Sequence, residues 1–272
     1  MNQNFIKRTL TCILGTSLLI ALIFLLPHHN FICLNLLVFA LCFFGISEIS
    51  AILSIKADII VYSSVLIPIC AFINPQMTEI ALCLFILITM FKQVIKGESD
   101  DFENSNKTMS SELLIIIYPA YLISFFTRFT CLYNVNSYSV FLLLLLVFTN
   151  DTFAYIFGML FGKNNNGIVK VSPKKSIAGF VGGTVVCIIV SIVYISIFST
   201  KLPYFSAFGK FLLGLTASIF ANAGDLAESV LKRSAKIKDS GNLIPGRGGV
   251  LDSIDSILTV SALFYTIFRF LR

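Results

Sequence analysis

The sequence of 272 residues has little charge for its length. Asp, Glu, Lys and Arg together make up 12% of the residues, whereas 57% are hydrophobic and the mean hydropathy is +0.90. The surface of a soluble domain cannot be this apolar, so the composition excludes a soluble globular protein. It predicts an integral membrane protein instead.

Histidine is scarce, and the cysteines lack the spacing of a metal or redox site. His28 and His29 are adjacent at an expected helix end, which favours a position at the membrane interface over a catalytic role. The seven cysteines show neither CxxC spacing nor nearby histidines, so we interpret them as small hydrophobic side chains. The net charge of +6 is explained by anionic lipid headgroups and gives no reason to expect nucleic acid as a partner.

Long apolar runs predict an all-α, polytopic protein with about nine transmembrane helices. A run of about 17 to 25 residues is long enough to cross a bilayer as a helix. The first run lacks a small-x-small cleavage site, so we expect a retained span rather than a signal peptide. The expected spans are residues 9–26, 31–55, 57–73, 78–93, 112–127, 138–161, 177–198, 204–224 and 251–271.

The basic residues predict how the chain is oriented. Most of the 20 Lys and Arg residues fall on one side of the membrane if the N-terminus is cytoplasmic. We therefore expect the polar C-terminal loops to lie in the cytoplasm. The localisation we expect for this multi-pass protein is the bacterial inner (cytoplasmic) membrane. Residues 1–130 are expected to form N-terminal membrane helices and residues 131–272 a catalytic region. The acidic run 97–112 is expected to be a solvated loop without chemistry.

Beyond Leu113 the acidic residues gather in polar clusters. A carboxylate at membrane depth costs roughly 2.5 to 3.5 kcal/mol, so each one needs a partner. Three interpretations compete: salt bridges between helices, an ion or proton pathway, and a metal and phosphate site. The acids concerned are Asp151, Asp225, Glu228, Asp239, Asp252 and Asp255.

Their spacing predicts two acidic helix faces on either side of a turn. Residues 221–239 continue a helical pattern, and Asp252, Asp255 and Ser256 open the last span at offsets of three and four. Between them, the glycines of residues 245–249 let the backbone approach a ligand closely. Carboxylates bind hard divalent cations and Lys or Arg meets phosphate oxygens, which favours the third interpretation. The first face carries Asp225, Glu228, Ser229, Lys232 and Lys236.

A second polar cluster, residues 149–183, begins near the end of the sixth expected span. Asp151 and Tyr155 lie one helical turn apart. Lys174 and Lys175 are explained equally well by positive-inside topology and by phosphate contact. The glycine pairs 158/162 and 179/183 favour close helix packing.

These residues resemble the signature of the phosphatidate cytidylyltransferase (CDP-diacylglycerol synthase) family. Residues 229–256 read S-x-x-K-R-x-x-x-x-K-D-S-G-x-L-I-P-G-x-G-G-x-L-D-x-x-D-S. Upstream, the strings D-x-x-A-Y-x-x-G-x-x-F-G-K, S-P-K-K-S and G-D-L-x-E-S also resemble the family. The resemblance covers about residues 149–256, and the N-terminal half shares only its hydrophobic, multi-spanning character.

The resemblance implies that phosphatidic acid attacks the α phosphorus of CTP, giving CDP-diacylglycerol and pyrophosphate. The attacking phosphate oxygen is already ionised, so no general base is needed, in keeping with the scarcity of histidine. Mg²⁺ is the implied cofactor, held by Asp225, Asp252 and Asp255, and a monovalent cation such as K⁺ is left open. The implied catalytic residues are Asp225, Asp252, Lys232, Arg233, Lys238 and Asp239, and the implied substrate-binding residues are Ser172, Lys174, Lys175, Ser229, Arg247, Gly248 and Gly249.

Two positions depart from the family pattern, and two other functions stay open. Arg247 stands where the family has His, and Ser253 stands where it has Arg, so Arg247 is hypothesised to supply the missing positive charge. A CTP-dependent polyprenol or phytol kinase is one alternative, and an ion or proton transporter is the other. The expected partners are CTP, phosphatidic acid and membrane lipids, and a homodimer is left open.

Overall fold

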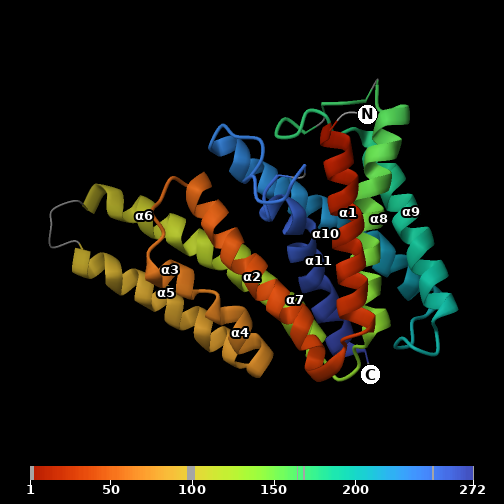
Figure 1. Cartoon of the computed structure of the whole chain (residues 1–272), viewed down its shortest axis with the longest axis horizontal. Coiled ribbons are helices and arrows are strands. Elements are labelled where there is room, and N and C mark those ends of the chain that lie inside the picture. Colours follow the sequence, from red (N-terminus) through yellow and green to blue (C-terminus); the bar gives the residue numbers. More distant parts are fainter. Residues whose placement is uncertain (1–2, 97–101, 164, 168, 247, 272) are drawn as a thin grey trace.

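The protein is described here by a computed structural model covering residues 3–96, 102–163, 165–167, 169–246 and 248–271 (Figure 1). The described residues form helices and loops without a strand, apart from isolated bridges that pair Asn166 with Ser176 and Ile244 with Gly248. Each of the nine expected spans contains helix. The elements are α1 (Gln3–Phe24), α2 (His28–Ile52), α3 (Ile59–Ser63), α4 (Leu66–Ile73), α5 (Met77–Lys96), α6 (Phe102–Ile115), the π-helical turn η2 (Ile116–Tyr121), α7 (Leu122–Thr130), α8 (Ser137–Phe161), α9 (Ile177–Ile197), α10 (Ala207–Ser234) and α11 (Leu251–Phe270).

The chain is an all-α, multi-pass membrane protein. Six helical stretches of the described residues are long and apolar enough to cross a membrane, and the expected number of nine spans remains a prediction. Residues 13–24 and 59–73 form shorter apolar helices. The six stretches are His28–Ile52, Met77–Ile95, Ser105–Thr130, Ser137–Phe161, Ile177–Ile197 and Leu251–Phe270.

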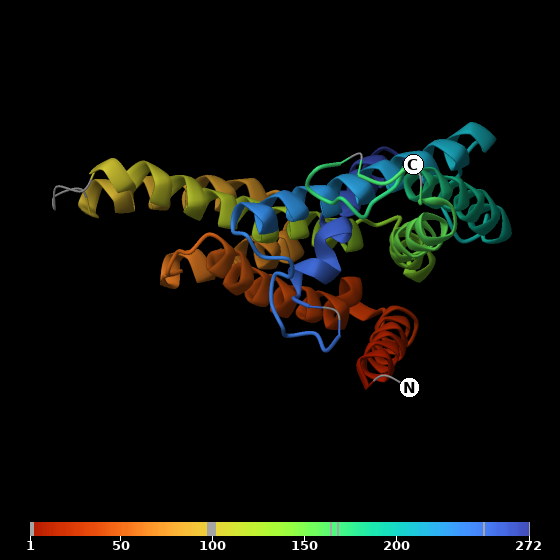
Figure 2. The ribbon, with the colours of Figure 1, turned by 90° about the horizontal axis from the view of Figure 1, so that it is seen from above.

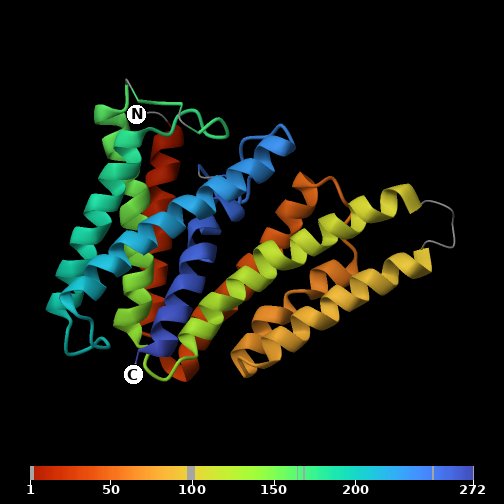
Figure 3. The same ribbon diagram turned by 180° about the vertical axis from the view of Figure 1, so that it is seen from behind.

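The helices of the C-terminal half pack around α10 and α11. From behind, α10 crosses α8 and α9 obliquely, while α7 lies against α11 (Figure 3). The α7–α11 contact buries Phe129 against the rings of Phe264 and Phe268, at centroid distances of 5.6 and 5.2 Å. The side-chain amide of Asn134 donates to the carbonyls of Phe268 and Leu271, which ties the end of α11 to the α7–α8 turn.

The polar loops gather at one end of the molecule. The described residues of two loops, 162–176 between α8 and α9 and 235–250 between α10 and α11, lie at the same end as the start of α1 (Figure 1). The 235–250 loop lies over α2 (Figure 2). The turn between α1 and α2 lies at the opposite end, where α2 begins at His28. One end of the bundle therefore holds the residues with candidate chemistry.

The structure corrects two local expectations. The acidic run 97–112 is not a solvated loop throughout, because α6 begins at Phe102 and Glu112 is buried in an ion pair with Lys92. Residues 97–101 of that run lie outside the described residues. The helix expected over 221–239 ends at Ser234, and Lys236 has a φ of +60°, so Lys236 does not continue the α10 face.

Candidate active site

A close crossing of α10 and α11 brings the two acidic faces together. A Cβ on Gly224 would lie 2.5 Å from the carbonyl oxygen of Asp255, so only glycine permits this approach. Ser256 Oγ donates to the carbonyl of Ala221 at 3.1 Å, and Thr259 Oγ1 donates to that of Phe220 at 2.7 Å. The crossing sets Asp225, the residue after Gly224, beside the first turns of α11.

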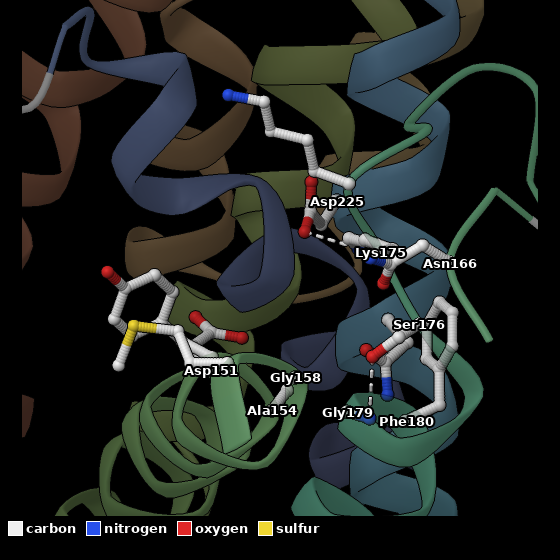
Figure 4. A pocket seen from close by; sticks show the side chains of 13 residues that line it. Asp151, Ala154, Gly158, Asn166, Lys175, Ser176, Gly179, Phe180 and Asp225 are labelled. Carbon is white, nitrogen blue, oxygen red and sulfur yellow. Dashed lines mark hydrogen bonds and ion pairs between the residues drawn. The ribbon is translucent and has the colours of Figure 1, made fainter. Parts of the chain in front are cut away.

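Asp225 faces a cavity between α8, α9 and α10. Its Oδ2 lies 2.5 Å from Lys175 Nζ, and its Oδ1 accepts a 3.4 Å hydrogen bond from Ser229. The cavity has a volume of about 470 Å³ and is lined by Asp225 and both lysines of the S-P-K-K-S string. Figure 4 shows the Asp225–Lys175 pair on one wall and Asp151, from α8, on another. Two regions that the sequence separates by about fifty residues thus form one charged cavity.

The glycine-rich packing of α8 and α9 shapes the wall of this cavity. Gly158 and Gly179 face each other, since a Cβ built on Gly179 would lie 3.5 Å from the Cα of Gly158 and 2.7 Å from the carbonyl of Ala154. The packing interpretation of the glycine pairs is confirmed at this contact. Ser176 Oγ accepts the amide hydrogen of Gly179 at 3.1 Å and so begins α9 immediately after Lys175 (Figure 4). Lys175 is held over the ring of Phe180 at 5.4 Å.

Asp252 organises the loop that precedes α11. Its Oδ2 accepts hydrogen bonds from the backbone amides of Ser240 and Gly249, both at 2.8 Å, and from Ser240 Oγ at 2.9 Å. Gly248 has a φ of +108°, a conformation that L side chains rarely adopt. One carboxylate oxygen therefore fixes both ends of the turn, while the other, Oδ1, is left for a different partner.

That partner is Lys232, which joins the two helices. Lys232 Nζ contacts Asp252 Oδ1 and lies 2.8 Å from Glu228 Oε2, one helical turn back on α10. Lys232 is 8% exposed and Glu228 is fully buried. The predicted faces are therefore joined by a buried ammonium group between two carboxylates.

A group of carboxyls lies beneath these pairs. Asp255 is 8% exposed, accepts the Ser256 amide at 2.5 Å and lies within the electrostatic influence of Asp225 and Glu228. Glu228 lies beyond the expected span 204–224, and burial raises its pKa to about 7 despite its contact with Lys232. Tyr118 of η2 buries its hydroxyl near the same acids, and neither Tyr118 Oη nor Glu228 Oε1 has a hydrogen-bond partner among the described residues.

The carboxyl groups suit a hard cation by their chemistry. Four carboxyl groups gather here, and three of them, those of Asp225, Glu228 and Asp252, form ion pairs with the ammonium groups of Lys175 and Lys232. Mg²⁺ prefers oxygen ligands, and the four carboxyl groups outnumber the two ammonium groups that neutralise them. Within the described ranges, no three acidic, His or Cys side chains already converge as a metal cluster. A cation would therefore take oxygens that a lysine now contacts, and Asp252 Oδ1 and Asp225 Oδ2 are such oxygens.

Glu48, on α2, was missed by sequence reasoning. Its Oε1 accepts the amide of Val250 at 2.8 Å, and its Oε2 accepts the amide of Leu251 and Ser240 Oγ, both at 2.9 Å. These contacts cross the expected boundary at residue 130. A lone glutamate inside an apolar run was a signal for such a partner, because a membrane carboxylate must be paired.

The remaining predicted residues have a looser relation to the site. Arg233 is exposed and donates to the carbonyls of Val171 and Ile237, so it ties the two polar loops together. Lys238 and Asp239 are exposed in the 235–250 loop. Ser172 belongs to the turn before Lys175 and does not line the cavity. Arg247 lies outside the described residues.

These features define a class: a polytopic membrane protein whose last helices carry a buried lysine–carboxylate site beside a charged cavity. A sequence model of the Cytidylyltransferase family matches residues 6–271, and the chain belongs to that family. The family match extends over the N-terminal half as well, where the motif resemblance found nothing specific.

Curated relatives agree with this family. The chain is 30% identical over 190 residues to "Phosphatidate cytidylyltransferase" of Bacillus subtilis, a match that covers 69% of this chain and 66% of the relative. It is 33% identical over 168 residues to the protein of that name from Thermotoga maritima, covering 61% of each. It is 43% identical over 116 residues to the one from Staphylococcus haemolyticus, covering 43% of each. The chain thus spans less than two thirds of the length of these relatives.

Proposed function

We propose that the protein is a phosphatidate cytidylyltransferase. In this reaction a phosphate oxygen of phosphatidic acid forms a bond to the α phosphorus of CTP. The bond from that phosphorus to the α–β bridging oxygen breaks, giving CDP-diacylglycerol and pyrophosphate. The observation that carries the proposal is the junction of Lys232 with Asp252 beside the Lys175–Asp225 cavity, in a chain of the cytidylyltransferase family.

The site has what such a transfer requires. Both reacting groups are anions, so catalysis consists of positioning them and offsetting their charge. Lys175 lines the cavity and is available to a phosphate if it leaves Asp225. Lys232 is likewise available to a phosphate if it leaves Asp252. No proton has to leave the nucleophile, which agrees with the lack of a histidine among the residues that line the cavity.

Mg²⁺ is proposed as the cofactor, with Asp225, Asp252 and Asp255 as its ligands. Bound there, it would neutralise charge on the triphosphate. Asp252 suits a double role, because its Oδ2 holds the loop through three donors while, among the described residues, its Oδ1 contacts the ammonium group of Lys232. The site is proposed to face the cytoplasm of a bacterial inner membrane, in line with the clustering of basic residues in these loops.

A lipid kinase that uses CTP is the alternative, and neither the family match nor the names of the relatives favour it. The soluble product distinguishes the two enzymes. Purified protein in detergent is supplied with CTP, Mg²⁺ and either phosphatidic acid or a polyprenol. Pyrophosphate that appears only with phosphatidic acid, and disappears when Mg²⁺ is chelated, supports the proposal. CDP that appears with the polyprenol overturns it in favour of the kinase.

A further inference from the structure

The start of α11 is capped by a carboxylate from a distant helix. The first amides of a helix have no partner within the helix, and the N-cap residue of α11, Val250, supplies no side-chain hydrogen bond. Glu48 accepts the amides of Val250 and Leu251 instead, and its negative charge faces the positive end of the helix dipole. α2 thus supplies the cap that the local sequence lacks.

The same carboxylate fixes the loop in front of α11. Glu48 Oε2 also lies 2.9 Å from Ser240 Oγ, whose single hydrogen is shared with Asp252 Oδ2 at the same distance. Glu48 and Asp252 therefore share Ser240 and hold adjacent stretches of backbone, at Gly249 and at Val250. Glu48 is thus connected to Asp252 twice, once through the Ser240 hydroxyl and once through the backbone of residues 249 and 250.

Two glycines of the loop lie so close to Glu48 that a side chain would not fit at either position. A Cβ on Gly241 would lie 2.6 Å from Glu48 Oε1, and a Cβ on Gly249 would lie 2.5 Å from Oε2. One turn earlier on α2, a Cβ on Gly45 would lie 3.1 Å from the side chain of Leu251, so small residues let α2 approach α11. Two glycines of the signature segment are thus explained by a residue more than 190 positions away.

We infer that Glu48 is a positioning residue: it holds the 240–251 loop so that Asp252 and Lys232 keep the geometry needed for turnover. It does not touch the cavity and is not assigned a chemical step. The inference rests on the proposed function for its effect on turnover, whereas its effect on the loop is independent of any activity.

The first test measures the loop itself. Backbone hydrogen exchange is followed in the substrate-free, full-length protein for wild type, Glu48→Gln and Glu48→Asp, with Ser47→Ala as the control because Ser47 is exposed on the same helix. Glu48→Gln removes the negative charge and replaces one of the two acceptor oxygens by an NH₂ group, which is expected to speed exchange within residues 249–251 about tenfold. Glu48→Asp keeps the charge and restores part of the protection. Exchange in α8 stays unchanged and reports that the fold is intact. Unaltered exchange within 249–251 in Glu48→Gln overturns the inference.

The second test measures turnover per folded molecule. In Glu48→Gln, kcat is expected to fall about tenfold or more while KM for CTP changes less than twofold, because the loop geometry, and not the cavity, is altered. Glu48→Asp recovers part of the loss, and Ser47→Ala keeps wild-type kcat. Faster loop exchange with an unchanged kcat refutes the positioning role. If wild type transfers no cytidylyl group, the proposed function has failed, and the exchange result still decides whether Glu48 holds the loop.

Discussion

Lys232 on α10 and Asp252 on α11 form an ion pair across the crossing of the two helices, and their side chains are only 11% and 10% exposed. The pair is extended on one side by Glu228 and on the other by the loop amides that Asp252 accepts. Removing one partner of such a pair leaves the other charge buried without compensation. The junction is therefore expected to govern both stability and turnover.

Lys232→Met is predicted to be strongly destabilising and inactive. The substitution keeps most of the side-chain volume but leaves Glu228 and Asp252 without their shared ammonium group. Breaking a buried pair in this way costs roughly 3 to 5 kcal/mol. Thermal unfolding in detergent and pyrophosphate release measure the two effects. The exposed Lys201 provides the control, since Lys201→Met should change neither. A Lys232→Met protein with wild-type stability would show that the ion pair does not stabilise the fold.

Asp225→Asn is predicted to lose turnover while keeping its fold. The side chain of Asp225 is 36% exposed, so loss of its charge costs little stability, but the cavity loses a carboxylate proposed to bind the cation. The expected fall in kcat is roughly a hundredfold. Steady-state kinetics at several Mg²⁺ concentrations, with thermal unfolding as the check on folding, provide the measurement. Near-normal turnover in this variant rules out the metal role of Asp225.

The two adjacent lysines are predicted to differ. Lys175 is partly buried, pairs with Asp225 and lies over Phe180, whereas Lys174 is exposed at the rim of the cavity. Lys175→Met should lower kcat/KM for CTP or phosphatidic acid by roughly a hundredfold. Lys174→Met serves as the matched neighbour and should have a much smaller effect. Equal and small effects of the two variants would instead favour membrane topology as the reason for both lysines.

Gly249→Ala is predicted to disrupt the loop by overpacking. The added Cβ would lie 2.0 Å from Ser240 Oγ and 2.5 Å from Glu48 Oε2, so the loop must shift. Such strain costs about 1 to 3 kcal/mol. The control is Gly15→Ala, because a Cβ at Gly15 meets no atom within 4 Å. Unfolding temperature and turnover should fall in the first variant only. A fully active Gly249→Ala protein would mean that the loop geometry is not required.

Much of the helical framework could be predicted from the sequence. Each expected span contains helix because apolar runs of bilayer length have few other ways to satisfy their backbone. The spacing of Asp225 and Glu228 before Lys232 predicted one face of α10, since helical periodicity is a local property. The end of that helix at Ser234 was not predicted, because no Gly or Pro follows until Gly241 to mark it.

The contacts that complete the site depend on tertiary structure. Glu48 lies in an apolar helix, and nothing in its neighbourhood indicates that it reaches residues 240–251. Likewise, Glu112 belongs to an acidic run typical of a loop, yet it is buried because Lys92 of α5 faces it. Each pairing joins residues brought together only by helix packing, which local patterns do not specify.

The central claim, transfer of a cytidylyl group to phosphatidic acid, is tested most directly by following two labels. Wild-type protein and Asp225→Asn are each given phosphatidic acid, Mg²⁺ and CTP labelled at either the α or the γ phosphorus, and the lipid fraction is then counted. The account predicts that the α label enters the lipid with wild type, that the γ label stays in water-soluble pyrophosphate, and that Asp225→Asn transfers little of either. Entry of the γ label into lipid, or no Mg²⁺-dependent entry of the α label, would contradict it.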